Sequence, residues 1–190
     1  MFDELDAYWS EVYAEMGETE TMQSVQAEID RKSEECKCNY TGQVEVYVSQ
    51  YLHLSSIAQG IRDGVAVEGG QLLGYSGSTG TERPHLHFEI RTYANGRLGP
   101  PMDPEFILLL RGLHRPLPNF DTRRISSYVS AARRHPELGT VRPHNGIDVF
   151  ALTGTPVYAV AAGTVIHAGW DRSRAPRGGA GIYISILHGR

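Results

Sequence analysis

Cysteine is almost absent from this sequence of 190 residues, which contains only Cys36 and Cys38. A disulfide between residues two positions apart is strained, so we expect no disulfide framework. Two thiolates at this spacing also lack the further ligands that a metal site needs. The pair is therefore interpreted as free or incidentally oxidised thiols.

Long apolar runs are missing as well. The stretch FILLL at 106–110 is far shorter than the roughly 18 residues of a membrane helix, so we expect no membrane span. The N-terminus has no basic segment followed by an apolar core, so it is not a Sec-type signal peptide. If the protein acts outside the cytoplasm, it gets there by another route or has lost a leader.

Lysine is absent from residues 39–190, where 15 arginines stand against 11 acidic residues. Residues 1–38 have the opposite balance, with 11 acidic against three basic residues. A basic body suits an anionic polymer such as cell wall or nucleic acid, although it also fits an ordinary solvated surface. Nothing besides this charge favours nucleic acid, so no nucleic-acid partner is expected.

Residues 1–41 are predicted to form an acidic helical arm. Apolar residues recur there at spacings of three and four and would form one stripe among acids, namely Phe2, Leu5, Trp9, Val12 and Met16. The arm carries no evident chemistry. Two roles stay open, attachment to a larger assembly or another copy of the chain, and coverage of a binding groove as a latency peptide.

After Gly42 the apolar period changes to two, which predicts strands. In QVEVYVSQYLHL, at 43–54, one face carries valines and leucines and would be the core face. The other face carries Tyr47, Tyr51 and His53, and the tyrosines either line a groove or simply pack. In all we expect roughly ten short strands and little helix beyond the arm, hence a mainly β body.

The stretch RPHLHFEI, at 83–90, places His85, His87 and Glu89 on one face of a strand. In RPHNGID, at 142–148, Asn-Gly favours a tight turn that would bring His144 back beside Asp148. Imidazole and carboxylate are both good Zn²⁺ ligands, and a catalytic zinc has three protein ligands and an open position. The sequence offers more ligands than three, which leaves at least one histidine to act as a base.

Each of these pieces is weak alone, because His-x-His in a strand is more often structural and H-x₃-D is commonplace. A cupin-like barrel with His85, His87 and Glu89 as ligands is one alternative. It leaves HNGID and the glycine-rich GYSGSTG, at 74–80, unexplained. His188, which precedes Gly189, is interpreted as a turn residue.

The combined pattern resembles the lysostaphin/LytM-type zinc metallopeptidases, which cut peptidoglycan. The matching stretches are RRHPELGTVRPHNGIDVFALTGTPVYAVAAGTVIHAG, YLHLSSI, GQLLGYSGSTGTERPHLHFEIR and GPPMDPEFIL. The resemblance implies a fold of two antiparallel sheets that form a groove with a zinc site. It implies His144, Asp148 and His87 as zinc ligands, and His53 and His85 as the two catalytic histidines. Glu89 is then a candidate to orient His87.

The motif order departs from that family, because H-x₃-D comes after the other motifs here instead of before them. The sequence therefore looks circularly permuted, with 42–110 and 122–190 forming one peptidase domain and 111–121 linking the usual C- and N-termini. Pairing of the halves between two chains, in a swapped dimer, would give the same order.

The predicted function is a zinc-dependent endopeptidase that cleaves cross-bridge or stem peptides of peptidoglycan. The substrate places it in the cell envelope, outside the cell or on a virion. A catalytically silent wall-binding or activator module of the same fold is the alternative. That alternative predicts lost ligands, and none is missing.

Overall fold

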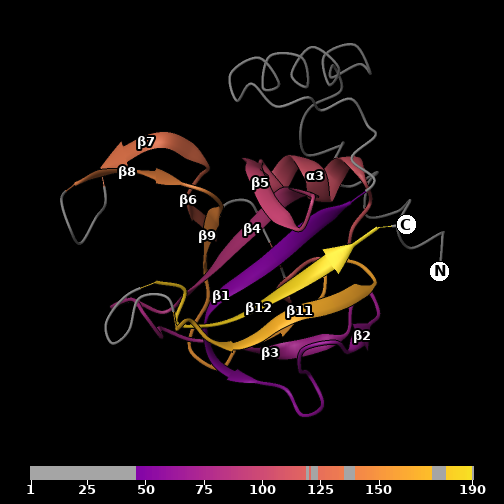
Figure 1. Ribbon diagram of the computed structural model, residues 1–190. Helices are drawn as coiled ribbons and strands as arrows, with labels where there is room; N and C mark the ends of the chain where they lie inside the picture. The colour runs from indigo at the N-terminus through magenta and orange to yellow at the C-terminus, as the bar shows by residue number, and fades with distance from the viewer. Residues whose placement is uncertain (1–45, 119, 121–123, 135–139, 173–178, 190) are drawn as a thin grey trace, which may run out of the picture. The chain divides into compact units, whose positions relative to one another are not determined.

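The computed structural model describes residues 46–118, 120, 124–134, 140–172 and 179–189 (Figure 1). The arm expected at 1–41, with its two cysteines, lies outside them. The described residues form twelve strands and one helix. In chain order these are β1 Tyr47–Ile57, β2 Ala66–Val67, β3 Leu72–Ser76, β4 His85–Ala94, β5 Arg97–Met102, α3 Pro104–Leu110, β6 Ile125–Ser127, β7 Ser130–Arg134, β8 Val141–His144, β9 Ile147–Phe150, β10 Pro156–Tyr158, β11 Gly163–Trp170 and β12 Ile182–His188.

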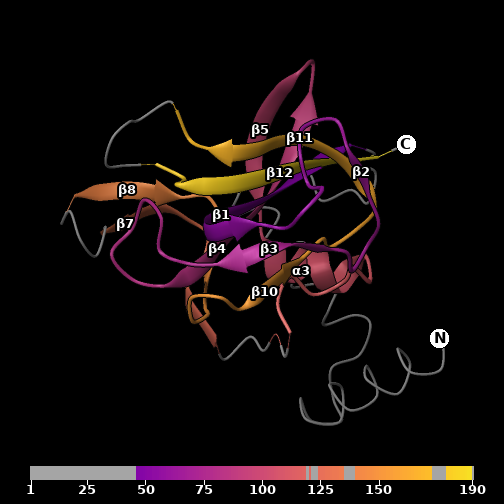
Figure 2. The ribbon, with the colours of Figure 1, turned by 90° about the horizontal axis from the view of Figure 1, so that it is seen from below.

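Ten of these strands form one antiparallel sheet, which confirms the mainly β prediction. Its main path runs β2-β11-β12-β1-β4-β9-β6, and β3, β5 and β10 join at its sides. Figure 2 shows the same sheet from below. The second sheet is only the β7–β8 ribbon, so within the described residues the two sheets are very unequal.

β1 and β12, the first and the last of these strands along the chain, are direct neighbours in the sheet. Residues Tyr47 of β1 and His188 of β12 are antiparallel partners, and the two strands run side by side at the centre of Figure 1. A short turn from the end of β12 to the start of β1 would make them a hairpin. This is the strand pairing that a circularly permuted chain requires.

The faces of β4 are as the sequence predicts. Leu86, Phe88 and Ile90 are fully buried on one face, while His87 and Glu89 lie on the other. Strict alternation of apolar and polar residues identifies the core face here, because all the apolar side chains are on one side.

Both faces of β1 are buried, because Val48 and Leu54 of the predicted core face and Tyr47 and Tyr51 of the other face are all in the interior. Tyr51 is the cross-strand partner of Phe88, and its ring centroid lies 5.2 Å from that of Phe88 in the core. Its hydroxyl accepts a hydrogen bond from the Val160 N–H, 2.9 Å away. Tyr47 is also buried, so neither tyrosine lines a groove. β1 lies between β12 and β4, and both of its faces are largely covered, so alternation identifies one core face and misses the second.

A hairpin and a capped helix follow β4. Asn95 and Gly96 have φ of 52° and 75°, as a two-residue hairpin turn requires, and connect β4 to β5. The side chain of Asp103 then accepts the backbone N–H groups of Glu105 and Phe106 at the start of α3. This helix contains FILLL. No helix among the described residues is long and apolar enough to cross a membrane.

His188 is a buried strand residue and not the turn residue that the sequence predicts. It is 2% exposed at the end of β12. Its Nδ1–H donates to the Ala162 carbonyl over 2.8 Å, and its Nε2 accepts from the Ser49 hydroxyl over 2.7 Å. The ring also stacks on Tyr47, with centroids 4.7 Å apart. Burial lowers the pKa of His188.

Candidate metal centre

Three side chains from β4, β8 and β9 converge on one point. His87 and Asp148 are cross-strand partners, and His87 Nδ1 lies 2.7 Å from Asp148 Oδ1. His144, the last residue of β8, brings its Nε2 within 3.0 Å of Asp148 Oδ1 and 3.1 Å of His87 Nδ1. The three residues that the family resemblance implies as ligands therefore lie together.

The tight turn expected at Asn-Gly does not join two paired strands. β8 pairs with β7, whereas β9 pairs with β4 and β6, so the chain bends between two strands that do not pair. Gly146 passes against β4 at this bend. A Cβ there would overlap the Phe88 carbonyl oxygen and would lie 2.8 Å from Glu89 Cγ. The glycine serves a close backbone approach and not a hairpin turn.

In His87 and His144, one ring nitrogen faces Asp148 and is called the inner nitrogen, and the other is called the outer nitrogen. Hydrogen bonds of the outer nitrogens fix the tautomers of both rings. His144 Nδ1 lies 2.8 Å from the Tyr128 carbonyl, and His87 Nε2 lies 2.9 Å from a carboxylate oxygen of Glu89. Carbonyl and carboxylate oxygens only accept, so each of these nitrogens carries the hydrogen. In the neutral rings, the inner nitrogens then direct lone pairs at Asp148 Oδ1.

When both rings are neutral, three lone pairs face one another with no hydrogen between them, and a cation would stabilise this arrangement. Zinc bonds to nitrogen and oxygen are about 2.0–2.2 Å long, so a single ion can contact all three atoms of a triangle with edges of 2.7, 3.0 and 3.1 Å. The donor set of two imidazoles and one carboxylate also suits this metal. Among the residues that the structure describes, one group of three potential ligands converges in this way.

Two further histidines border the triad. The ring centroids of His53 and His85 are 4.9 Å apart, and His85 Nε2 lies 3.5 Å from Asp148 Oδ1. Each donates its Nδ1–H to a backbone carbonyl 2.8 Å away, Thr79 for His53 and Arg83 for His85. Their Nε2 atoms are therefore left to accept a proton.

His53 reaches the site through an irregularity in β1. The pairing of β1 with β12 shifts register between Tyr51 and Leu54, and His53 has a φ of 64°. Such a bulge re-aims a side chain, and strained backbone of this kind clusters at functional sites. Simple alternation places His53 on the same face as Tyr51. The bulge instead leaves Tyr51 in the core and brings His53 beside His85.

Without a metal, the carboxylates of Asp148 and Glu89 favour the protonated form of His87, so a proton occupies the place where the cation would bind. Burial acts to raise the pKa of Asp148, but its contacts with His144 and His87 keep that pKa well below its usual range. Burial acts to lower the pKa of His87, yet the carboxylates of Asp148 and Glu89 raise it to about 9. A bound metal replaces this proton, since ligand imidazoles must be neutral.

His53 has the opposite electrostatic environment. Burial, together with the positive charges that His85 and His87 can carry, lowers the pKa of His53 to about 4. The ring is therefore neutral at neutral pH, with its lone pair on Nε2.

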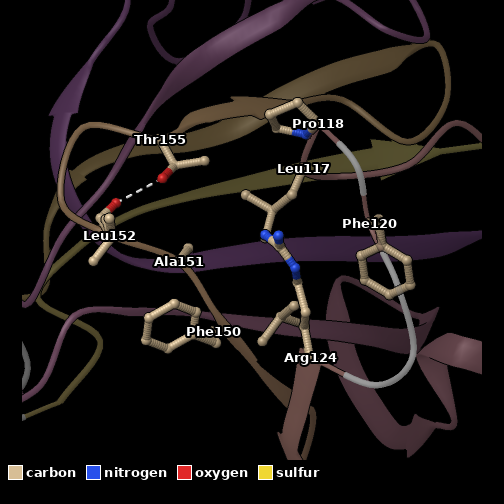
Figure 3. A pocket seen from close by; sticks show the side chains of 9 residues that line it. Leu117, Pro118, Phe120, Arg124, Phe150, Ala151, Leu152 and Thr155 are labelled. Carbon is tan, nitrogen blue, oxygen red and sulfur yellow. Dashed lines mark hydrogen bonds between the residues drawn. The ribbon is translucent and has the colours of Figure 1, made fainter.

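A separate cavity of about 190 Å³ contains none of these residues. It is lined by Leu117, Pro118, Phe120 and Arg124 on one side and by residues of 149–155 on the other. Figure 3 shows the Arg124 side chain reaching toward Leu117. The titratable groups of the metal centre are elsewhere, so this cavity is not where the chemistry is concentrated.

The sequence did not indicate the backbone groups that orient the histidines. The carbonyls of Thr79, Arg83 and Tyr128 depend on chain path alone, and no residue type marks them. Glu89 could be proposed in advance, because its place two residues after His87 on the same strand face is a readable signal.

Comparison with known sequences agrees with this geometry. The sequence model of Peptidase family M23 matches residues 39–104 and 142–190, more than half of the chain. The first segment contains His53, His85 and His87, and the second contains His144 and Asp148. The match in two segments fits the rearranged motif order.

Three curated relatives match shorter stretches. An uncharacterized metalloprotease of Haemophilus influenzae is 45% identical over 67 residues, which are 35% of this chain and 13% of that protein. Peptidoglycan DD-endopeptidase ShyC of Vibrio cholerae is 34% identical over 68 residues, 36% of this chain and 14% of its own length. The lipoprotein NlpD/LppB homolog of Pseudomonas aeruginosa is 47% identical over 60 residues, 32% and 18% respectively. The matches therefore cover less than a fifth of each relative. No solved structure matches the chain significantly.

Proposed function

This chain belongs to peptidase family M23, and on that premise we propose that it is a zinc metallopeptidase that hydrolyses peptide bonds of peptidoglycan. One observation carries the proposal. His144 Nε2, His87 Nδ1 and Asp148 Oδ1 lie within 3.1 Å of one another, with both ring tautomers fixed so that lone pairs converge. These three residues would hold the metal.

The metal supplies Lewis acidity toward a carbonyl oxygen and increases the acidity of water. His53 and His85 would handle the proton. Their Nε2 atoms face the site, and burial keeps His53 neutral and able to accept. In the reaction, water oxygen bonds to the carbonyl carbon and the carbon–nitrogen bond breaks. One water proton passes through a histidine Nε2 to the leaving amine, so both products are complete.

Both proton-handling histidines are held in place by backbone. The Nδ1–H bonds of His53 to Thr79 and of His85 to Arg83 keep each Nε2 directed inward. His85 has 17% of its side chain exposed and would meet the substrate amide. His53, which is neutral with its lone pair on Nε2, would accept a proton from the attacking water.

The substrate class follows from the family and from the relative described as a peptidoglycan DD-endopeptidase. Cross-bridge and stem peptides are both included in the proposal. The site of action is then the cell envelope, reached from outside the cell or from a virion.

The silent-module alternative has no observation in its favour, because all three ligands and both flanking histidines are present. The cupin-like alternative is wrong. The potential ligands that converge are His87, His144 and Asp148, and neither His85 nor Glu89 is among them; the matching family is M23.

The test is the metal content of the purified protein and of His144→Ala, His87→Ala and His85→Ala, followed by digestion of purified peptidoglycan. We expect about one zinc per chain in the wild type and in His85→Ala, and loss of zinc in the other two. Mass spectrometry of the released peptides then identifies the bond that is cut. A wild type that takes up no zinc, or that keeps zinc without His144, would contradict the proposal.

A further inference from the structure

His87 differs from the other three histidines of the site in what holds its outer nitrogen. His53, His85 and His144 each donate to a backbone carbonyl, which is neutral and fixed by the chain. His87 donates its Nε2–H to the side chain of Glu89 over 2.9 Å. The orientation of this one ring therefore depends on an ionisable side chain.

Glu89 is buried in an unusual way for a carboxylate. It is 7% exposed, and its Oε2 has no hydrogen-bond partner among the described residues. Besides His87, the cationic Arg91 lies close to this carboxylate, with its Nη1 3.5 Å from Oε2. Burying a charged group is costly unless opposite charge compensates it. A cation in the triad, on the other side of the His87 ring, would provide that compensation.

Arg91 is itself held by the neighbouring hairpin. Its Nε and Nη2 both donate to the Gly99 carbonyl of β5, over 2.9 and 2.7 Å. β5 lies against β4 at this point, because a Cβ on Gly99 would overlap Thr92 Oγ1. The guanidinium is therefore directed by backbone, and it faces the oxygen of Glu89 that His87 leaves free.

We propose that Glu89 is a positioning residue of the metal centre, which selects Nδ1 of His87 as the metal-binding atom and supplies the second buried negative charge beside a divalent cation. The tautomer follows from hydrogen-bond chemistry, since a carboxylate cannot donate and the hydrogen must stay on Nε2. Neutral imidazoles leave Asp148 as the one charged ligand, so Glu89 balances the remaining positive charge through the ring. The inference rests on the proposed function for the identity of the site.

Two substitutions separate the two contributions. Glu89→Gln keeps an oxygen that accepts from His87 Nε2–H but removes the charge, whereas Glu89→Ala removes both. The matched control is Glu68→Gln, at an exposed glutamate directly after β2. The measurements are the zinc dissociation constant, by competition with a chromogenic chelator, and the visible absorption spectrum of the Co²⁺-loaded protein. The thermal midpoints of the metal-free proteins report folding.

We expect Glu89→Ala to weaken zinc binding about 100-fold and to shift the Co²⁺ bands, as loss of a partner behind a ligand histidine does. Glu89→Gln should weaken binding about 10-fold and leave the bands nearly in place. Glu68→Gln should match the wild type in every measurement.

Wild-type zinc affinity and an unchanged Co²⁺ spectrum in both Glu89 variants would overturn the positioning role. If His144→Ala loses zinc in the same experiment, that result leaves the proposed function standing. Absence of zinc from the wild type would overturn both. If Glu89→Ala does not fold, Glu89→Gln decides the question, because it retains the shape and the hydrogen-bond acceptor.

Discussion

His87 and Asp148 are 61 residues apart in the chain, yet they are direct cross-strand partners with Nδ1 and Oδ1 2.7 Å apart. β4 carries the first and β9 the second, so pairing of these two strands brings together two of the three potential metal ligands. Anything that separates β4 from β9 should therefore act on metal binding as well as on stability.

The strongest case is Gly146, where the chain passes against β4. In Gly146→Ala the new Cβ meets the Phe88 carbonyl and Glu89 Cγ, both of which are held in the sheet. We expect a loss of about 2–4 kcal/mol in the free energy of unfolding, with weaker zinc binding. Urea denaturation and metal titration measure the two effects.

Gly169→Ala is the control for this substitution, since the nearest atom to its Cβ would be 3.8 Å away, an ordinary contact. It should change stability by no more than about 0.5 kcal/mol. Equal effects of the two substitutions would contradict the close approach at Gly146.

The two bordering histidines should be separable from the ligands by metal content. His53→Ala and His85→Ala should each keep about one zinc per chain and lose about 10²–10⁴-fold in kcat/KM on a peptidoglycan peptide. His114→Ala, at an exposed histidine, should change neither quantity. Loss of zinc from His53→Ala would mean that His53 belongs to the metal ligands.

The hydroxyl of Tyr51 should matter for stability and not for substrate binding. Tyr51→Phe leaves the Val160 N–H buried without its acceptor, which costs about 1–3 kcal/mol. KM should stay at the wild-type value, because this ring lies in the core. Tyr128→Phe removes a hydroxyl from a residue that is 52% exposed and should leave stability unchanged. A raised KM in Tyr51→Phe would restore the groove interpretation.

His188 predicts a pH dependence of folding. Burial places its pKa in the folded state below the unfolded value of about 6.5. The unfolded state then binds more protons below that pH, so this residue contributes no loss above pH 6.5 and a growing loss as pH falls below it. The neighbouring groups, Tyr47, Ser49 and the Ala162 carbonyl, carry no negative charge that would stabilise the imidazolium.

The measurement compares urea midpoints at pH 7.5 and 5.0 in the presence of chelator, so that metal binding does not contribute. His188→Gln should be less stable than the wild type at pH 7.5, and its further loss at pH 5.0 should be smaller. An equal or larger acid-induced loss in the variant would show that His188 does not titrate in the assumed way.

The sequence predicts best those strands in which apolar and polar side chains alternate strictly between the two faces. β4 separates Leu86, Phe88 and Ile90 from His85, His87 and Glu89, and alternation identifies both faces. Motif resemblance brings in His144 and Asp148 from the other half of the chain, which no periodicity could place beside β4.

The errors arise where local pattern and tertiary packing disagree. β1 is covered on both faces, so its alternation identifies Val48 and Leu54 as core residues but does not show that Tyr47 and Tyr51 are buried too. His53 depends on a bulge, which occupies a single residue and leaves no periodic trace. Asn145 and Gly146 resemble a hairpin turn, but the strands beside them pair elsewhere. The arm at 1–41 stays a prediction.

The pairing of Tyr47 with His188 has a consequence for how the protein is encoded. Because β12 and β1 are antiparallel neighbours, a short turn could connect them and the chain could begin at another exposed loop. The metal centre depends on which strands pair, and not on where the chain begins. A gene can therefore carry the two halves of this site in either order, provided that the strands meet in the same register.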